Sequence, residues 1–515
     1  MRIDEILGLI VRDDADLLAL IAEVSSESCE GGRFAGTEEA TEHDESNFPH
    51  VCTLFGWMEG RDWWYTTESS PPVTNAEKIV ANIRLMTLAP GHFHAALVHK
   101  EMHPSIYPKV YVYGPLDADL IAHMERVNGL NGPLKKNLSW RLDVRAGDDW
   151  LQRFIRECPG NVAVISGQNH RKIDLMHHAI ANSVHILADK PWIIEADDMT
   201  KLEDLLFQAQ LREVLSFDMM TERHEITNIL QRELIMDRDI FGVLKEGTPD
   251  EPAVFMESVH YLKKLVAGQP LRRPEWFFDI QTQGEGLTDV GTHLVDLAMW
   301  LVFPDQVIDY RADIKMISGE RWPTVLDVNQ YRDVTGKAQF HDSLASAIQN
   351  DRLHYFCNNR VKYAIRGYHV QLDVLWDYEA TSGGDTHQST IRGTFSHIKI
   401  RQGKNAGDKP ELIVTPTTTR DCHGVGRSLE RKLESWQTRW PGLKVVPLGI
   451  EYQVFIPDAL RIGHEAHFAR VVDEFLHYIW NPRSMPKWEM PNLLAKYYVT
   501  TQGVAMGRSG ASVGA

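Results

Sequence analysis

Short apolar runs alternate with longer stretches of helical periodicity between residues 82 and 216. The apolar runs lie at 83–88, 110–113, 162–166, 184–188 and 214–217. Helical patterns cover 92–102, 117–127, 148–157, 170–181 and 197–211. Strands that alternate with helices are typical of βαβ units and a parallel sheet. We therefore predict a Rossmann-type, doubly wound dinucleotide-binding domain over residues 81–216.

The pattern changes after residue 217, where apolar and polar residues alternate over longer stretches such as 363–378 and 389–400. Alternation of this kind predicts antiparallel strands with one buried face. Two helical patterns, 464–479 and 490–506, follow near the end of the chain. We expect residues 217–508 to form an α+β domain for substrate binding and oligomerisation, with a large, mostly antiparallel open sheet.

The two ends of the chain differ from these domains. Residues 6–24 have the pattern of a short amphipathic helix, whereas residues 27–47 are acidic and rich in glycine, for which disorder is the expected state. We interpret residues 1–80 as an N-terminal extension of unclear role. Residues 509–515 are predicted to be a flexible tail.

Composition narrows the class of protein. With 515 residues, 43% of them hydrophobic and 24% charged, the chain has the profile of a globular protein of two or three domains. Its net charge of -17 argues against nucleic acid and anionic membranes as partners. The five cysteines show no CxxC spacing, and no signal peptide or membrane span is recognisable. We expect a cytoplasmic protein with reduced thiols and a small-molecule partner.

The turn after the first apolar run is the place for a dinucleotide-binding fingerprint. Residues 89–94 read Ala-Pro-Gly-His-Phe-His, so that only the middle glycine, Gly91, remains. That glycine lets a pyrophosphate approach the helix amino terminus. The second run is followed by Tyr113-Gly114-Pro115 in place of a ribose-binding acid, and Asp117 lies a few residues further. This corner contains no arginine or lysine that could bind the 2′-phosphate of NADP, so NAD is slightly preferred.

An acid, a lysine and a proline, Asp189-Lys190-Pro191, follow the run at 184–188. The carboxyl ends of strands are where open α/β sheets bind ligands. Lys190 is a long cation that can reach a hydroxyl or carbonyl oxygen there. The run at 162–166 ends in a similar position with Ser166-Gly167-Gln168-Asn169.

Together with residues 289–296, Asp-Val-Gly-Thr-His-Leu-Val-Asp, these segments resemble the family of glucose-fructose oxidoreductase, inositol dehydrogenase and the rhizopine-catabolism oxidoreductases, Gfo/Idh/MocA. The family pattern is a glycine-rich turn, Thr-Pro-Asn, Glu-Lys-Pro and Asp-x-Gly-x-His-x-x-Asp, in this order. The resemblance covers residues from about 80 to 305. It implies NAD or NADP bound by Gly91, His92, Phe93, Asn169 and Lys190. Lys190 would lie between the nicotinamide ribose and the substrate.

Asp289, His293 and Asp296 are spaced at i, i+4 and i+7, which places them on one face of a helix. An imidazole flanked by carboxylates titrates near neutral pH and can accept a proton from a substrate alcohol. We assign His293 as the general base, Asp289 as its orienting partner, and Lys190 as the cation that polarises the oxygen. Alternatively, such a cluster is purely structural, and Asp296 braces a neighbouring side chain.

Four residues are predicted to bind the substrate: His260, Tyr261, Arg273 and Trp276. Polar and aromatic groups of this kind suit sugar hydroxyls. The competing interpretation is that the basic residues around them are surface charge. His260 and His293 with Asp289 match no strong metal signature, so we predict no metal site.

These features predict an NAD(P)-dependent oxidoreductase that interconverts a secondary alcohol and a ketone of a sugar or polyol, in a homo-oligomer such as a dimer or tetramer. One alternative is a glycosidase or lyase that oxidises its substrate transiently with tightly bound NAD, for which His260 and Tyr261 are spare acid-base candidates. A second is a non-catalytic, nucleotide-sensing regulator. The reduced glycine turn favours the regulator, whereas Lys190, Asp289 and His293 oppose it.

Overall fold

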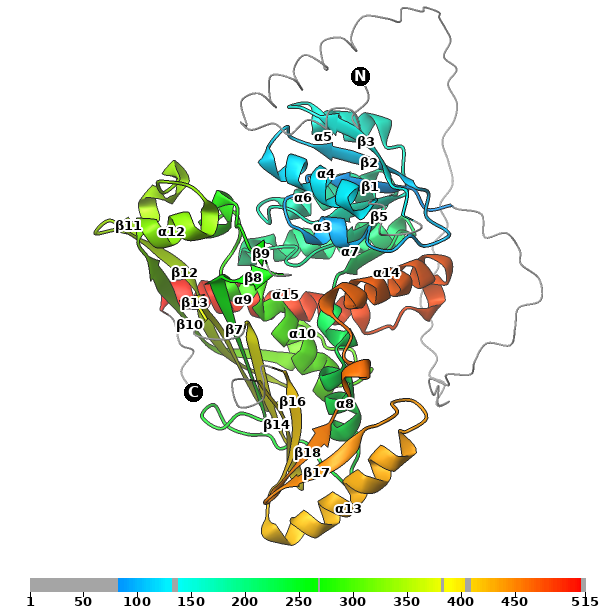
Figure 1. Ribbon diagram of the computed structural model, residues 1–515, viewed down its shortest axis with the longest axis vertical. Coiled ribbons are helices and arrows are strands. Elements are labelled where there is room, and N and C mark those ends of the chain that lie inside the picture. The colour runs from blue at the N-terminus through cyan, green and yellow to red at the C-terminus, as the bar shows by residue number, and fades with distance from the viewer. Residues whose placement is uncertain (1–81, 132–137, 267–268, 381–383, 403–408, 511–515) are drawn as a thin grey trace, which may run out of the picture. The chain divides into compact units, whose positions relative to one another are not determined.

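The computed structural model of the protein describes residues 82–131, 138–266, 269–380, 384–402 and 409–510 (Figure 1). The predictions for residues 1–80, and for the tail beyond residue 510, lie outside the described residues. Among the helices of the described ranges, none combines the length and the apolar character that a membrane crossing requires.

A six-stranded parallel sheet forms the first half of the described chain, as predicted. Its strand order, β3-β2-β1-β4-β5-β6, reverses direction between β1 and β4, and ligands bind at such a point in open α/β sheets. The sequence pattern missed only β3, a partly polar edge strand. The strands are β1 (Leu85–Leu88), β2 (Lys109–Gly114), β3 (Arg141–Ala146), β4 (Val162–Ile165), β5 (His185–Ala188) and β6 (Ser216–Asp218).

The helices between these strands agree with the predicted ranges, except for the first. The predicted helix 92–102 is wrong in length, because α3 ends at Leu97. Beyond it, His99 and Lys100 donate to the carbonyls of Ala96 and Leu97, which are i to i−3 bonds that replace the α-helical ladder. The helices are α3 (His94–Leu97), α4 (Ala118–Leu130), α5 (Trp150–Glu157), α6 (Lys172–Ala181) and α7 (Met199–Leu211).

Two helices from the end of the chain complete the cores of this first sheet. The predicted helices 464–479 and 490–506 are confirmed as α14 (His464–Trp480) and α15 (Glu489–Ser509). Phe468 and Phe475 of α14 belong to the core on one face of the sheet. Tyr497 of α15 belongs to the core on the other face, where its ring stacks on Trp192 with centroids 6.0 Å apart. The sequence pattern did not predict this return of the chain.

The second half contains a ten-stranded sheet in the order β10-β12-β13-β7-β14-β15-β16-β18-β17, with β11 paired to β12. Only the β13–β7 pair is parallel, so the predicted large, mostly antiparallel sheet is confirmed. The strands are β7 (Val254–Lys263), β10 (Ile314–Leu326), β11 (Ile348–Gln349), β12 (Arg352–Ile365), β13 (Tyr368–Glu379), β14 (Thr386–Arg392), β15 (Ser396–Arg401), β16 (Glu411–Pro416), β17 (Lys444–Leu448) and β18 (Glu451–Phe455). A separate small pair joins β8 (Leu265–Val266) to β9 (Gln269–Pro270).

The stretches 363–378 and 389–400 are hairpins and not single strands, which corrects the prediction. Arg366 and Gly367 turn the first of them, with φ angles of 51° and 88°. Two successive residues of positive φ are typical of the tight turn that matches strand twist in a hairpin. Gly393 lies in the second turn, where a Cβ atom would lie 2.2 Å from the carbonyl oxygen of Phe241.

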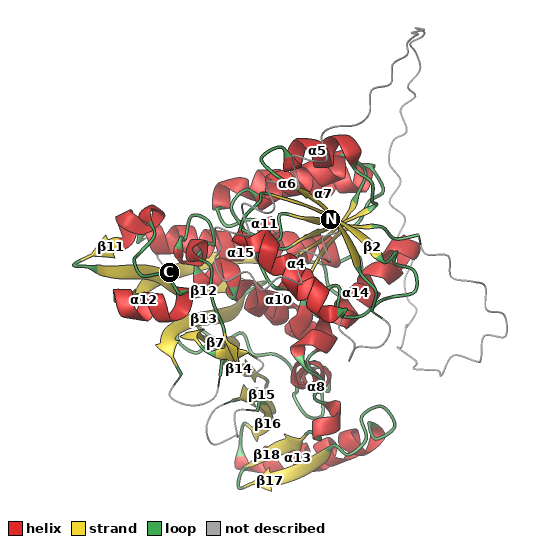
Figure 2. Ribbon diagram, turned by 45° about the horizontal axis from the view of Figure 1, so that its top comes forward, coloured by secondary structure: helices red, strands yellow, loops and turns green. Residues whose placement is uncertain are grey.

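Helices cover one side of the large sheet and form the main core with it. In Figure 2 the strands follow one another from β12 to β17, with α10 and α8 beside them. Leu230 of α8 and Leu297 of α10 are buried in the same core as Met256 of β7 and Val374 of β13. The helices of this half are α8 (Ile226–Ile235), α9 (Gly286–Asp289), α10 (Gly291–Val302), α11 (Tyr310–Asp313), α12 (Val328–Thr335) and α13 (Thr419–Ser435).

A buried network of charges links the two halves. Lys496 of α15 is 1% exposed, and its Nζ lies 3.1 Å from Asp218 at the end of β6 and 3.2 Å from Asp296 of α10. Arg223 donates two hydrogen bonds of 2.6 Å to Asp296 and also pairs with Glu489 at 2.9 Å. Burial alone would lower the pKa of Lys496, but the carboxylates of Asp218 and Asp296 raise it above its ordinary value. The network therefore keeps its charges in the folded protein.

Replacement of Lys496 should be strongly destabilising. Lys496→Met leaves the buried Asp218 carboxylate without its cation and leaves Asp296 with Arg223 alone, and we expect the free energy of unfolding to fall by about 3–5 kcal/mol. Urea denaturation followed by circular dichroism measures this loss. Lys201→Met is the control, because Lys201 is half exposed and pairs with Asp198 at the surface. Equal unfolding midpoints for Lys496→Met and the wild type would contradict the role of the network.

Candidate functional site

The loops after β1 and β4 touch each other through glycines. Leu88 and Ile165 are paired at the ends of these strands, and the N–H groups of Gly91 and His92 donate to the carbonyl of Ser166. A Cβ atom at Gly167 would lie 2.1 Å from the carbonyl oxygen of Ala89. Only glycine fits there, although the sequence prediction assigned a role to Gly91 alone.

The turn keeps the backbone of the fingerprint at the first glycine position as well. Ala89 stands there with a φ of 43°, in the region that favours glycine. A Cβ atom at Gly91 would lie 3.3 Å from the backbone of Gly167 and 3.3 Å from the Asp119 carboxylate. The close backbone approach that dinucleotide binding uses is therefore preserved in a turn with one glycine in place of three.

A pocket of about 340 Å³ opens beside this turn. Apolar side chains line it together with the carboxylates of Asp117 and Asp119. Asp117 caps α4, because its side chain accepts a hydrogen bond from the N–H of Leu120. Burial raises the pKa of Asp119 to about 6. The pocket is lined by residues 88–91, Pro115, Asp117, Asp119, Leu120, Trp150, Leu151, Ile165, Gly167, Gln168, residues 170–172, Asp174, Leu175 and His178.

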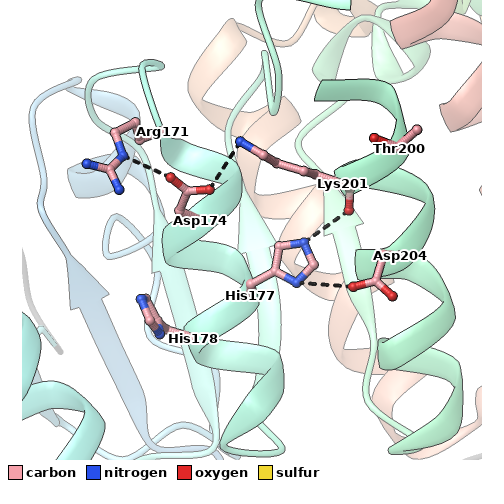
Figure 3. A pocket seen from close by; sticks show the side chains of 7 residues that line it. All are labelled: Arg171, Asp174, His177, His178, Thr200, Lys201 and Asp204. Atoms are coloured by element: carbon pink, nitrogen blue, oxygen red, sulfur yellow. Dashed lines mark hydrogen bonds and ion pairs between the residues drawn. The ribbon is translucent and has the colours of Figure 1, made fainter. Parts of the chain in front are cut away.

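A second depression lies between α6 and α7 (Figure 3). Its charged groups are already paired with one another. Asp174 contacts Arg171 at 2.9 Å and Lys201 at 3.6 Å, and His177 lies 3.8 Å from Asp204. Few free donors or acceptors remain for a ligand, so we place the site at the carboxyl ends of the strands instead.

Lys190 and Asp289, 99 residues apart, form an ion pair between the two halves. Lys190 Nζ lies 2.5 Å from Asp289 Oδ1, and the two side chains are 9% and 14% exposed. Burial alone would lower the pKa of Lys190, but Asp289 and Asp189 raise it. Burial would raise the pKa of Asp289, but the charge of Lys190 lowers it. Both groups are therefore charged. The sequence prediction assigned both to one site, but it paired Asp289 with His293 and not with Lys190.

Asp289 and His293 do not share one continuous helix, which corrects the predicted face. Helix α9 ends at Asp289 and α10 begins at Gly291. The N–H of His293 donates to the carbonyl of Val290, an i to i−3 bond that tightens the chain between the two helices. Residue spacing alone assumes an unbroken helix, so it did not reveal this break.

His293 is neutral and lacks the flanking carboxylates that were expected. Asp289 is bound to Lys190, and Asp296 is bound to Arg223 and Lys496. Among the described residues, no hydrogen-bond partner contacts the buried His293 Nδ1. Burial, and then the charge of Lys190, lower the pKa of His293 well below its ordinary value. The expected titration near neutral pH is therefore wrong, and Asp296 braces the structure.

Three side chains from the two loops meet at Asp189. The Nδ1 atoms of His92 and His94 lie 2.8 and 2.9 Å from Asp189 Oδ2. Ser166 Oγ donates to the same oxygen at 3.1 Å. The Phe93 ring packs against both imidazoles, with its centroid 4.5 Å from each. The sequence analysis missed His94, although its place at the third glycine position was a usable signal.

Two polar residues near Lys190 complete this region. Asn169, predicted to bind the cofactor, donates to the carbonyl of Gln283 at 2.7 Å and accepts from Lys172 Nζ at 2.7 Å. Its side chain therefore joins the two halves. Glu222 lies in a short 3-10 helix, Thr221–His224, and burial, followed by the charge of Glu225, raises its pKa to about 7. A carboxyl group with such a pKa is a candidate for proton transfer that the sequence did not indicate.

His260 lies on the large sheet in a chain of hydrogen bonds. Its Nδ1 lies 2.9 Å from Asp385 Oδ2, and its Nε2 lies 2.7 Å from Ser258 Oγ. The ring packs on Trp376 at 4.9 Å. Tyr261 follows His260 on β7, and successive side chains of a strand point to opposite faces. The two residues therefore do not line one site, which corrects their joint assignment to the substrate.

Arg273 and Trp276 are also separated. Arg273 donates to the carbonyls of Tyr261 and Leu262, and its guanidinium lies 4.4 Å from the Phe277 ring centroid. Trp276 instead donates from Nε1 to Asp119 Oδ2 at 2.7 Å, beside the dinucleotide turn. We therefore correct the role predicted for Trp276 from substrate contact to the rim of that turn.

The neutral state of His293 can be measured directly. We expect the nitrogen-15 shifts of its imidazole to stay those of the neutral form across the range in which an ordinary histidine titrates, about pH 5.5 to 7.5. Lys190→Met should raise the pKa of His293, because it removes the neighbouring positive charge. Assignment by comparison with His293→Gln identifies the signal. A midpoint near neutral pH in the wild type would contradict the burial described here.

Comparisons with known proteins extend these observations. Residues 230–508 match the family described as "Putative oxidoreductase C terminal domain". A crystal structure of a "putative oxidoreductase from Parabacteroides merdae ATCC 43184" is 39% identical, with a TM-score of 0.82 over 84% of this chain and 98% of that one. No curated protein matches the sequence.

More distant crystal structures share the fold alone. An "oxidoreductase domain protein from Kribbella flavida" is 14% identical, with a TM-score of 0.55 over 84% of this chain and 98% of that one. The structure of "GenD2 from gentamicin A biosynthesis in complex with NAD" is 12% identical, with a TM-score of 0.51 over 84% of this chain and 97% of that one.

Proposed function

Because the chain belongs to the Gfo/Idh/MocA family of oxidoreductases, we propose that it binds a nicotinamide dinucleotide and interconverts a secondary alcohol and a ketone of a carbohydrate or polyol. The observation that carries the proposal is the ion pair between Lys190 and Asp289 at the carboxyl end of β5. It places a permanent cation where open α/β sheets bind their ligands. The substrate is a small molecule, and the protein forms a homo-oligomer in the cytoplasm.

The residues at the first sheet fit a dinucleotide. Gly91 and Gly167 let the loops after β1 and β4 approach each other closely, and the pocket of about 340 Å³ lies beside them. Pro115, Trp150 and Leu151 offer it an apolar wall for an adenine ring. When bound, a nicotinamide dinucleotide supplies or accepts a hydride. The structure of GenD2 with NAD, which has the same fold, supports this choice of cofactor.

His293 and Lys190 have separate roles in the proposed reaction. Neutral His293 has one unprotonated ring nitrogen, which can accept the proton of a substrate hydroxyl. Lys190 donates a hydrogen bond to the same oxygen and stabilises the negative charge that develops there. Asp289 holds the ammonium group in place and keeps it charged. In the opposite direction, Lys190 polarises the ketone oxygen.

Variants of the two central residues test the proposal. Nucleotide extracted from the purified protein identifies the cofactor, and a panel of sugars and polyols is then followed by nicotinamide absorbance. We expect Lys190→Met and His293→Ala each to lower kcat/KM by about 10²–10⁴-fold, because His293→Ala removes the proton acceptor and Lys190→Met removes the cation that stabilises the developing charge. Dinucleotide affinity, measured by calorimetry, should change little.

Lys201→Met is the matched control, since Lys201 lies at the surface between α6 and α7. A regulator that only senses the nucleotide would keep its function in all three variants. Activity of Lys190→Met equal to that of the wild type would overturn the proposal.

We further propose that the site prefers NAD. The carboxylates of Asp117 and Asp119 line the pocket and would repel the 2′-phosphate of NADP, whereas Arg171 and Lys172, which also line it, are engaged with Asp174 and Asn169. The Kd for NADP should exceed that for NAD by about tenfold or more, which corresponds to about 1.4 kcal/mol. Asp117→Ser should narrow this ratio, because serine keeps the helix cap but removes the charge. Calorimetric titration at pH 8 measures both constants, with Asp204→Asn as the control.

The hydrogen-bonded chain of Ser258, His260 and Asp385 favours a second candidate function. It is a separate acid-base group on the large sheet, as a transient oxidation followed by elimination requires. A lyase or glycosidase of this type would cleave a glycoside without added cofactor. Turnover of that kind, lost in His260→Ala, would favour this function over net oxidation.

A further inference from the structure

Asp189 and the two imidazoles that contact it, those of His92 and His94, have the composition of a metal site. His92 and His94 supply imidazole nitrogens from the turn after β1, and Asp189 supplies a carboxylate from the end of β5. Their ligand atoms lie within 4.8 Å of one another. Atoms bound to one zinc ion at about 2.0–2.2 Å are about 3–4 Å apart, so small side-chain rotations would close the set around an ion.

Hydrogen bonds satisfy only one of the two carboxylate oxygens of Asp189 in this cluster. Asp189 Oδ2 lies within 3.1 Å of three donors, from His92, His94 and Ser166. The other oxygen, Asp189 Oδ1, is buried and has no hydrogen-bond partner within the described ranges. A buried carboxylate oxygen without a partner is costly. An ion between the imidazoles and the carboxylate would engage one oxygen and leave the other to accept from Ser166.

We infer that His92, His94 and Asp189 bind a divalent first-row transition metal ion such as Zn²⁺. Two imidazole nitrogens and one carboxylate oxygen suit zinc, cobalt or iron, whereas Mg²⁺ and Ca²⁺ prefer oxygen ligands alone. Three protein ligands leave one tetrahedral position for water or a substrate oxygen, as in catalytic zinc sites. This site goes beyond the sequence prediction, which assigned no metal.

The surroundings of the cluster allow an ion to enter. The His92 side chain is 36% exposed, whereas those of His94 and Asp189 are 10% and 4% exposed. The approach is therefore from the His92 side. Lys190 follows Asp189 in the chain, but Asp289 compensates its charge. None of the three ligands is among the described residues that line the dinucleotide pocket.

Metal titration of the full-length protein tests the inference. After treatment with a chelator and its removal, Zn²⁺ alone is titrated by calorimetry, and Co²⁺ alone by visible absorption. We expect one equivalent of either ion per chain, a Co²⁺ ligand-field spectrum that Zn²⁺ abolishes, and no binding of Mg²⁺. His92→Ala and Asp189→Asn should each weaken Zn²⁺ binding by more than about 100-fold, because each removes a ligand.

His177→Ala is the control, since His177 lies beside Asp204 outside the cluster and should leave Zn²⁺ affinity unchanged. His92→Ala removes a partly exposed side chain, so thermal melting will show whether it folds like the wild type. The inference is overturned if the wild type shows no saturable Zn²⁺ binding, or if His92→Ala binds Zn²⁺ as the wild type does. Dinucleotide binding by the wild type is measured in a separate experiment, and its result tests the proposed function and not the metal site.

Discussion

The position of His293 depends on one buried cation, Lys496. Its ammonium lies between Asp218, at the end of the first sheet, and Asp296, on the helix that carries His293. Because three buried charges in direct contact tolerate little displacement, this contact fixes α10 against β6. The same contact thereby fixes His293 relative to Lys190. Asp296 belongs to the same sequence motif as Asp289 and His293, and its contact with Lys496 holds that motif in place.

Asp189 and Lys190 are neighbours in the chain but serve opposite halves of the site. Asp189 accepts hydrogen bonds from His92, His94 and Ser166, all of which belong to the first sheet. Lys190 reaches Asp289 at the start of the second half. Consecutive side chains of an extended chain point in opposite directions, so the strand end naturally addresses both sides. Aspartate is one methylene shorter than glutamate, and its carboxylate lies within hydrogen-bonding distance of the two imidazoles.

The periodicity of the chain predicted the two sheets and most helices, because period reports burial on one face. It missed β3, whose alternating charges resemble those of a loop, and the turn at Arg366, which lies inside a continuous alternation. Strand ends and motif order predicted that Lys190, Asp289 and His293 belong to one site, but they assigned Asp289 as the partner of His293 and not of Lys190. They did not predict Asp385 or Trp376, whose partners lie more than 100 residues away in the sequence. Period does not tell which element packs on which, and the break after Asp289 depends on a local turn.

The return of α14 and α15 to the first sheet also bears on how the protein is made. Phe475 and Tyr497 fill the cores on its two faces, yet they are synthesised well after the strands that they cover. The six strands are synthesised nearly three hundred residues earlier, as counted from β6 to α15. During that interval their apolar faces lack their final cover, which is the condition in which nascent chains recruit chaperones. Final packing of the first sheet therefore cannot occur before α14 and α15 have been synthesised.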